Sequence, residues 1–267
     1  MDDTRSLMAF DRMVRIGGAT SVTEIPAGLV IRHSGLPTLH HLNALLLDAP
    51  LAPELRDPLA LTSLADEALA GLGHRHVVLD DADAAEEIAA ALALNGWAQQ
   101  RVLLMLRVRE PDRTPQPGLA RRLTAEEAHA LQLEITAAEA PGSKGAVADA
   151  LVRMLVRGQE ALRAGTRSLV FGSALESGPT ASMCTLFAGD GVAMIEEVGT
   201  LERFRGHGLA RAVVSAAVDA ALELGCERIF VPADADDWPQ LLYLKLGFEP
   251  VARQVSFTLR APGDARR

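Results

Sequence analysis

Two glycines, Gly206 and Gly208, stand where this sequence could bind an anion. The apolar run 191–200 predicts a strand before them, and the Ala- and Val-rich run 209–224 predicts a mostly buried helix after them. Glycines at such a junction let a ligand approach the backbone closely. The free N–H groups and the dipole of the helix N-terminus then attract negative charge. The sequence therefore predicts a phosphate-binding turn.

The residues around these glycines decide between three anion-binding motifs. Arg203 and Arg205 add positive charge suited to phosphate. A Walker A loop requires Gly-Lys-Ser/Thr after the second glycine, and Leu-Ala-Arg follows here, which excludes a nucleotide triphosphatase of that type. A dinucleotide-binding turn would have a small residue where Arg211 stands. The third pattern is Arg or Gln, two residues, Gly, one residue, then Gly or Ala, and residues 205–210 satisfy it throughout.

With this loop the sequence resembles the GNAT superfamily of acyl-CoA-dependent N-acyltransferases, in which the loop holds the pyrophosphate of coenzyme A. The resemblance continues downstream, where Tyr243 precedes a Gly-Phe pair at the family's spacing. Asp236 stands where the family has asparagine, and Pro239 replaces a small residue. The resemblance covers about residues 116–259.

The resemblance implies that acetyl-CoA is the co-substrate and that an amine attacks its thioester directly, without a covalent enzyme intermediate. In this scheme the Tyr243 hydroxyl serves the departing thiolate as a general acid. A backbone N–H near Val198 stabilises the oxyanion. The predicted cofactor-binding residues are Val198, Gly199, Thr200, Arg203, Arg205, Gly206, His207, Gly208, Leu209, Ala210 and Asp236.

Glu196 and Glu197 lie side by side in the predicted strand 191–200. Strand alternation is expected to send their side chains to opposite faces of the sheet. The amine arrives as an ammonium and must lose a proton before it attacks, and a carboxylate could accept that proton. Either glutamate could be this general base, with a slight preference for Glu196.

The sequence also contains an internal repeat. Each half ends with a short buried strand, an acidic turn, a helix closed by a glycine, and a final strand that begins with an aromatic residue. The pairs Gly96-Trp97 and Gly247-Phe248 mark the same point in the two copies.

A linker is predicted at 110–118, where three prolines and a glycine interrupt the structured patterns. We predict an α/β fold of two tandem GNAT-like domains, each a twisted mixed sheet flanked by helices. The first, at 1–112, is a degenerate copy without the cofactor loop. The second, at 116–267, is the catalytic domain that binds acetyl-CoA.

Composition and charge limit the classes of function. The formal net charge of -9 disfavours nucleic acid and anionic lipid as partners and mildly favours a cationic amine. No apolar run is long enough to span a membrane and no secretory signal is recognised, so a cytoplasmic protein is expected. Two cysteines do not make a disulfide framework. The histidines His33, His40 and His41 lack further residues at ligand spacing, so no metal site is predicted. A homodimer is left open.

The sequence thus predicts an N-acetyltransferase that acts on an amine of a small molecule or peptide. One alternative is a module that binds acyl-CoA without turnover, and another is a nucleotide-dependent oxidoreductase built on the same glycine turn. Tyr243 favours turnover, and Arg211 disfavours the oxidoreductase. The acceptor pocket is expected between the segment 140–165 and the first half, although neither carries a recognisable code.

Overall fold

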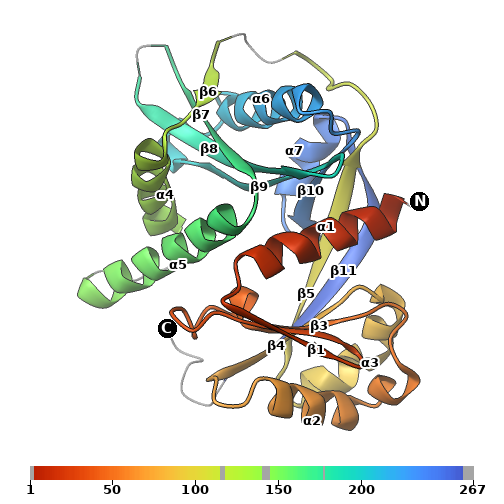
Figure 1. Cartoon of the computed structure of the whole chain (residues 1–267). Coiled ribbons are helices and arrows are strands. Elements are labelled where there is room, and N and C mark those ends of the chain that lie inside the picture. Colours follow the sequence, from red (N-terminus) through yellow and green to blue (C-terminus); the bar gives the residue numbers. More distant parts are fainter. Residues whose placement is uncertain (1–2, 115–117, 140–144, 177, 261–267) are drawn as a thin grey trace.

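Eleven strands form one mixed sheet over the residues that the computed structural model describes, which are 3–114, 118–139, 145–176 and 178–260. Their order across the sheet is β1-β2-β3-β4-β11-β5-β10-β9-β8-β7-β6 (Figure 1). The strands of the first half are β1 (Ser21–Ile25), β2 (Gly28–Arg32), β3 (Ala44–Leu47), β4 (His74–Leu79) and β5 (Ala98–Arg107). Those of the second half are β6 (Ala120–Arg122), β7 (Ser168–Ala174), β8 (Thr180–Gly189), β9 (Val192–Thr200), β10 (Arg228–Asp234) and β11 (Phe248–Arg260).

Helices cover both faces of the second half of the sheet. The helices are α1 (Asp3–Gly17), α2 (Pro58–Ala68), α3 (Ala82–Leu94), α4 (Ala125–Glu139), α5 (Ala146–Gly165), α6 (Leu209–Glu223) and α7 (Pro239–Lys245). α6 and α7 pack on one face, in a core that contains Val213 and Tyr243. α1 packs on the other face, where Phe10 contacts a core that contains Met194. No helix in the described ranges is long and apolar enough to cross a membrane.

The last strand of each half lies inside the sheet of the other half. β11 pairs antiparallel with β4 and with β5. β5 pairs antiparallel with β11 and with β10. In Figure 1, β5 in yellow and β11 in blue run side by side between the two halves. The domain division at 112–116 stays a prediction, because the sheet continues across it, and residues 115–117 of the predicted linker lie outside the described residues.

The repeat in the sequence corresponds to two strand-helix-strand units, β4-α3-β5 and β10-α7-β11. Each helix is followed by a glycine with positive φ, 83° at Gly96 and 91° at Gly247. The aromatic residue that follows, Trp97 or Phe248, is buried. A left-handed glycine ends a helix without the steric cost that a Cβ would bring. The same turn therefore places the same aromatic anchor in both halves.

β9 and β10 part after a short parallel ladder. They pair only over Val192–Met194 and Arg228–Phe230, while β9 stays paired with β8 as far as Thr200. Beyond this ladder, no pairing between the two strands is found in the described residues. The sheet is open between them at this point.

The joint between the halves can be tested at Gly247. A Cβ at this position would lie 2.0 Å from the carbonyl oxygen of Arg109, and φ is also positive. Gly247→Ala is expected to lower the free energy of unfolding by about 3 kcal/mol or more, because a backbone clash adds to left-handed strain. Gly225→Ala has similar strain but no heavy atom within 4 Å of the new Cβ, and should cost about 1 kcal/mol. Urea denaturation measures both, and equal losses would contradict the proposed clash.

Candidate active site

The predicted phosphate loop joins β9 to α6 through a short 3-10 helix, Glu202–Phe204. Gly206 and Gly208 are left-handed, with φ of 81° and 79°. A Cβ at either glycine would have no heavy atom within 4 Å, so the loop is open on that side. The first hydrogen bond of α6 runs from the Ala212 N–H to the Gly208 carbonyl, and no described side chain caps the helix. The preceding N–H groups are therefore free to face an anion.

The polar side chains of the loop, Arg203, Arg205 and His207, lie at its exposed rim. Arg203 donates to Glu134 of α4 over 2.7 Å. Arg205 Nε donates to the Thr200 carbonyl over 3.2 Å. His207 folds back, with Nδ1 2.9 Å from the Arg205 carbonyl oxygen. Arg205 also lies 3.6 Å from Glu139, so both arginines of the rim are ion-paired with glutamates of α4.

The other predicted cofactor residues are spread over three elements. Leu209 and Ala210 form the first turn of α6, and the segment Val198–Thr200 ends β9 beside the parting from β10. A Cβ at Gly199 would lie 2.8 Å from an isoleucine of α4, so this glycine lets α4 pack closely. Asp236 follows β10, and its carboxylate lies 3.8 Å from Arg101 of β5. Asp236 thus contacts β5, the strand of the first half that lies inside the sheet of the second half.

Tyr243 is buried on α7, with only 6% of the residue exposed. Its ring packs edge-on against Phe248. Burial, and to a lesser degree the charges of Glu196 and Cys184, raises the pKa of its hydroxyl, which therefore stays protonated at neutral pH. No group in the described ranges hydrogen-bonds this hydroxyl, so its proton can serve a ligand.

A bulge in β9 corrects the prediction that Glu196 and Glu197 face opposite sides of the sheet. Glu197 has a left-handed backbone, with φ of 58°, which is uncommon for a residue other than glycine. Thr185 of β8 pairs with Glu196, whereas Met183 pairs with Gly199, so β9 carries one extra residue. The bulge interrupts the alternation. Both glutamates consequently line the same cavity.

The two glutamates differ in their partners. Glu197 Oε2 accepts a hydrogen bond from Arg163 over 2.6 Å and another from Thr185. Within the described part of the chain, Glu196 has no ion pair and no side-chain hydrogen bond. Burial above all, and next the charge of Asp11, raises the pKa of Glu196 to about 7. Glu196 is the carboxylate suited to exchange a proton near neutral pH.

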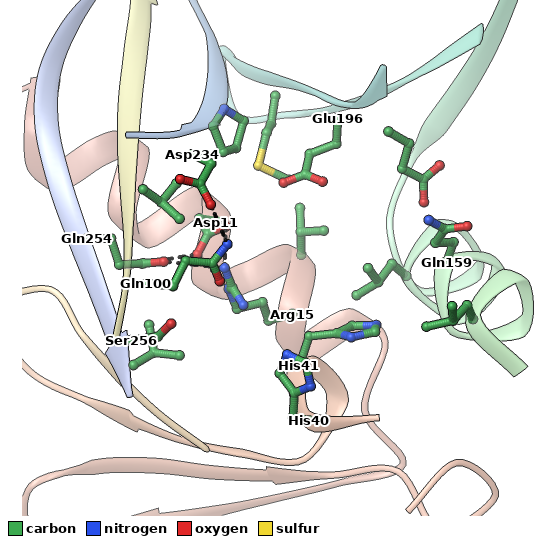
Figure 2. A pocket seen from close by; sticks show the side chains of 18 of the residues that line it. Asp11, Arg15, His40, His41, Gln100, Gln159, Glu196, Asp234, Gln254 and Ser256 are labelled. Atoms are coloured by element: carbon green, nitrogen blue, oxygen red, sulfur yellow. Dashed lines mark hydrogen bonds and ion pairs between the residues drawn. The ribbon is translucent and has the colours of Figure 1, made fainter. Parts of the chain in front are cut away.

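The cavity lies between the two halves and has a volume of about 620 Å³. Among the residues that line it, the first half contributes Asp11, Arg15, His40, His41 and Gln100. The second half contributes Gln159, Glu196, Asp234, Gln254 and Ser256, as Figure 2 shows. Gln159 belongs to the segment 140–165, which the sequence analysis placed beside the expected acceptor pocket. Residues 140–144 of this segment lie outside the described residues.

Sequence reasoning missed several of these residues. Asp11 and Arg15 lie one helical turn apart in an ordinary amphipathic helix, which gives no local signal. The sequence predicts no metal site at His40 and His41, because further residues at ligand spacing are lacking. In the structure the two rings lie 5.9 Å apart, and burial lowers the pKa of each to about 4, so both are neutral at neutral pH. No group of three or more His, Cys, Asp or Glu side chains in the described ranges could hold a metal.

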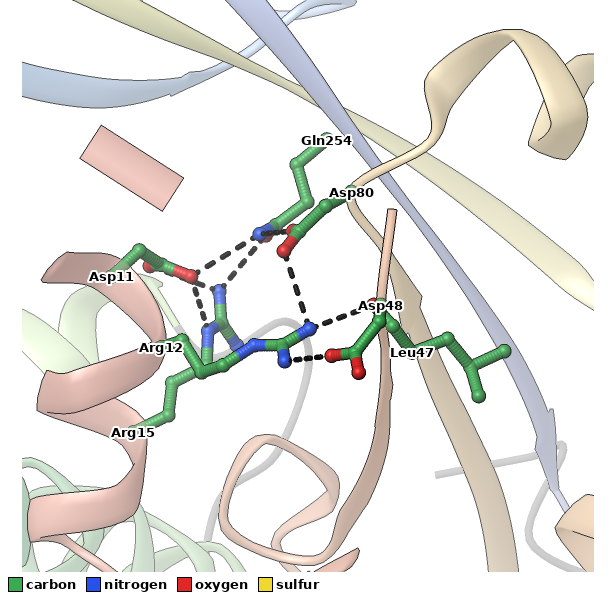
Figure 3. A network of polar contacts seen from close by, with 7 residues as sticks. All are labelled: Asp11, Arg12, Arg15, Leu47, Asp48, Asp80 and Gln254. Carbon is green, nitrogen blue, oxygen red and sulfur yellow. Dashed lines mark hydrogen bonds and ion pairs between the residues drawn. The ribbon is translucent and has the colours of Figure 1, made fainter. Parts of the chain in front are cut away.

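A polar network joins the cavity to both halves of the sheet (Figure 3). Arg15 donates to Asp11 over 2.7 Å and to Gln254 of β11 over 3.3 Å. Gln254 donates in turn to Asp80, which follows β4, over 2.9 Å. Arg12 also reaches Asp80, over 3.3 Å. The network holds α1, which carries Arg15 and Asp11, against β11, the strand of the second half that pairs with β4 of the first half.

Comparison with known proteins identifies the second half. Residues 141–248 match the model of the acetyltransferase (GNAT) family. This part of the chain is a GNAT acetyltransferase domain. The match supports acyltransferase activity in general terms. No curated protein sequence matches the chain.

Solved structures resemble the chain over almost its whole length, at identities that show the fold alone. A conserved protein of unknown function from Staphylococcus epidermidis is 12% identical, with a TM-score of 0.67, over 91% of this chain and 95% of its own. A GCN5-related N-acetyltransferase from Kribbella flavida is 19% identical, with a TM-score of 0.61, over 99% and 97%. A tandem GNAT protein from the clavulanic acid biosynthesis pathway is 13% identical, with a TM-score of 0.55, over 98% and 96%. The predicted fold of two GNAT-like units in tandem is confirmed.

The unusual pKa of Glu196 predicts how stability depends on pH. Its value in the folded chain, about 7, lies above its ordinary value of 4.5, so the neutral acid stabilises the fold. This contribution is complete below pH 4.5 and is lost as the pH rises through 7. Glu196→Gln keeps the neutral shape at every pH, so its melting temperature should exceed that of the wild type increasingly from pH 5 to pH 8. Thermal melts at several pH values measure the difference.

The control for this experiment is Glu223→Gln, which changes an exposed glutamate near the end of α6. Its melting temperature should follow the wild type at all pH values. A constant difference between Glu196→Gln and the wild type from pH 5 to pH 8 would contradict the raised pKa.

Proposed function

We propose that the chain is an N-acetyltransferase that transfers the acetyl group of acetyl-CoA to an amine of a small molecule or peptide by direct attack. The observation that carries the proposal is the parting of β9 and β10. Tyr243 of α7 borders this parting on one face of the sheet. Glu196 lines the cavity on the other face, and its charge contributes to the raised pKa of the Tyr243 hydroxyl. A proton donor and a proton acceptor thus approach the same point from opposite faces.

The phosphate loop supports coenzyme A as the ligand on the α6 side. Open left-handed glycines and an uncapped helix N-terminus form a cradle that a side chain at Gly206 or Gly208 would fill. Backbone N–H groups and the helix dipole would hold the pyrophosphate there. The edge of β9 at Val198–Thr200 is free of β10 and would accompany the pantetheine.

The cavity supports binding of the amine on the opposite side. Glu196 would accept the proton of the incoming ammonium, for which a pKa of about 7 is well matched to neutral pH. The bulge leaves Glu197 and Val198 without a paired residue in β8, and a backbone N–H at Val198 would be available to stabilise the oxyanion. The overall negative charge of the chain supports a cationic acceptor.

Tyr243 would donate its proton to the departing thiolate. A covalent intermediate on cysteine is disfavoured, because burial raises the pKa of the Cys184 thiol, which also donates to the Val213 carbonyl over 3.3 Å. Cys226 is buried in the same core. Direct attack therefore fits these residues better than a two-step route.

Binding of coenzyme A can be tested at the loop. Gly208→Asp is expected to lower the affinity by at least about 100-fold, because it places a carboxylate against the pyrophosphate at a position where the fold itself has room. Gly71→Asp in the first half is the matched control, because Gly71 also has a positive φ, 83°, and an added Cβ there would meet no heavy atom within 4 Å. Calorimetry should find one site per chain in the wild type and in the control. Two equivalent sites, or normal affinity in Gly208→Asp, would contradict the assignment of the loop.

Turnover can be tested at Tyr243. Tyr243→Phe keeps the packing of the ring and should keep the affinity for acetyl-CoA, but it should slow acetyl transfer by about 100-fold, because the general acid is lost. Single-turnover measurement of the chemical step avoids masking by product release. A normal rate would remove the catalytic role of Tyr243. A wild-type chain that binds acetyl-CoA but transfers to no amine in a broad screen would support the alternative, a regulatory module that binds acyl-CoA without turnover.

A further inference from the structure

The cavity presents more negative than positive charge to a ligand. Its charged lining consists of five carboxylates and one guanidinium among the described residues. The guanidinium, that of Arg15, is already paired with Asp11 at 2.7 Å. Asp234 receives only neutral hydrogen bonds, including one of 3.0 Å from Gln100. An occupant with positive charge and many hydrogen-bond donors is therefore favoured.

Three buried polar atoms of residues that line the cavity have no hydrogen-bond partner in the described part of the chain. They are Glu197 Oε1 on β9, Gln159 Oε1 on α5 and His41 Nε2, and the first two are acceptors only. The Glu197 side chain is only 4% exposed, and its two side-chain partners, the guanidinium of Arg163 and the hydroxyl of Thr185, both donate to the other oxygen, Oε2. A buried acceptor without a donor costs free energy that a ligand with suitable N–H groups would recover.

The opposite wall adds no competing positive charge. His40 and His41 face the cavity across from Glu196 in Figure 2. Burial lowers the pKa of both to about 4, so they are uncharged at neutral pH. A second ammonium in the cavity would therefore meet carboxylates and neutral rings, and no unpaired cation.

We infer that the acceptor is a small diamine, held by its second, non-reacting ammonium at Glu197 Oε1 and Gln159 Oε1 while its first amine faces Glu196. The inference rests on the proposed function and adds the class of substrate. During transfer the first ammonium loses one proton to Glu196, and the free amine attacks the thioester carbonyl to form the C–N bond. The C–S bond breaks as Tyr243 protonates the departing thiolate, and the second proton lost by the nitrogen restores the Tyr243 hydroxyl. The second ammonium keeps its proton throughout. A cavity of about 620 Å³ suits a compact ligand of this kind.

Binding tests the inference independently of catalysis. Isothermal calorimetry on the full chain compares 1,4-diaminobutane with butylamine and with 4-aminobutanoate, which replaces the second ammonium by a carboxylate. We expect the diamine to bind at least about tenfold more tightly than butylamine, because it gains charge-assisted hydrogen bonds. The amino acid should bind most weakly. Equal affinity for the diamine and butylamine, or tighter binding of the amino acid, would overturn the inference.

Variants at position 159 locate the second ammonium. Gln159→Leu should remove most of the preference for the diamine over butylamine, whereas Gln159→Glu should increase it. Gln99→Leu is the matched control, because Gln99 lies on β5 and binds Glu86 away from the cavity lining. The control should keep the wild-type preference. An unchanged preference in both variants at position 159 would overturn the proposed position.

Release of coenzyme A thiol with the same amines separates the two proposals. If the diamine binds preferentially but no amine is acetylated, the proposed function fails and the assignment of the cavity stands. If butylamine is acetylated with the same kcat/KM as the diamine, the proposed function stands and the diamine inference fails.

Discussion

The pairing of β5 with β11 at the centre of the sheet is the interaction on which the rest of the structure depends. Each strand completes a core that belongs mainly to the other half. Met105 of β5 packs in the core that contains Tyr243, and Val255 and Phe257 of β11 pack in the core of the first half. Hydrophobic burial is the main source of stability in domains of this size. Neither half therefore has a finished core without the other.

This exchange of strands, in which β5 lies in the sheet of the second half and β11 in that of the first, also explains why residues of both halves line the candidate site. The two exchanged strands lie next to each other on the floor of the cavity, where Gln100 of β5 and Gln254 of β11 line it. Gln254 is held by Asp80 and in turn holds Arg15. The first half lacks a glycine loop, yet it supplies the wall opposite Glu196. Its contribution in this arrangement is the shape and charge of the cavity.

Local patterns in the sequence were sufficient for the features that local chemistry decides. The glycines at 206 and 208 and the paired glycine-aromatic turns depend on backbone conformations that neighbouring residues dictate. Glu197 could not be anticipated, because a left-handed glutamate is stabilised here by Arg163 and Thr185, which lie elsewhere in the sequence. The exchange was equally hidden. Both copies carry the same local pattern, and nothing in that pattern says which neighbour the last strand joins.

The position of β11 along the chain has a consequence for synthesis. It is made after every other strand, although it fills the middle of the sheet between β4 and β5. While the chain grows, β4 and β5 both keep an unpaired edge, and the apolar residues that β11 will cover stay uncovered. A nascent chain in this state can accept the equivalent strand of a neighbouring copy on the same messenger RNA. Formation of the sheet within one chain thus depends on β11 reaching its place between β4 and β5 before the equivalent strand of another copy does.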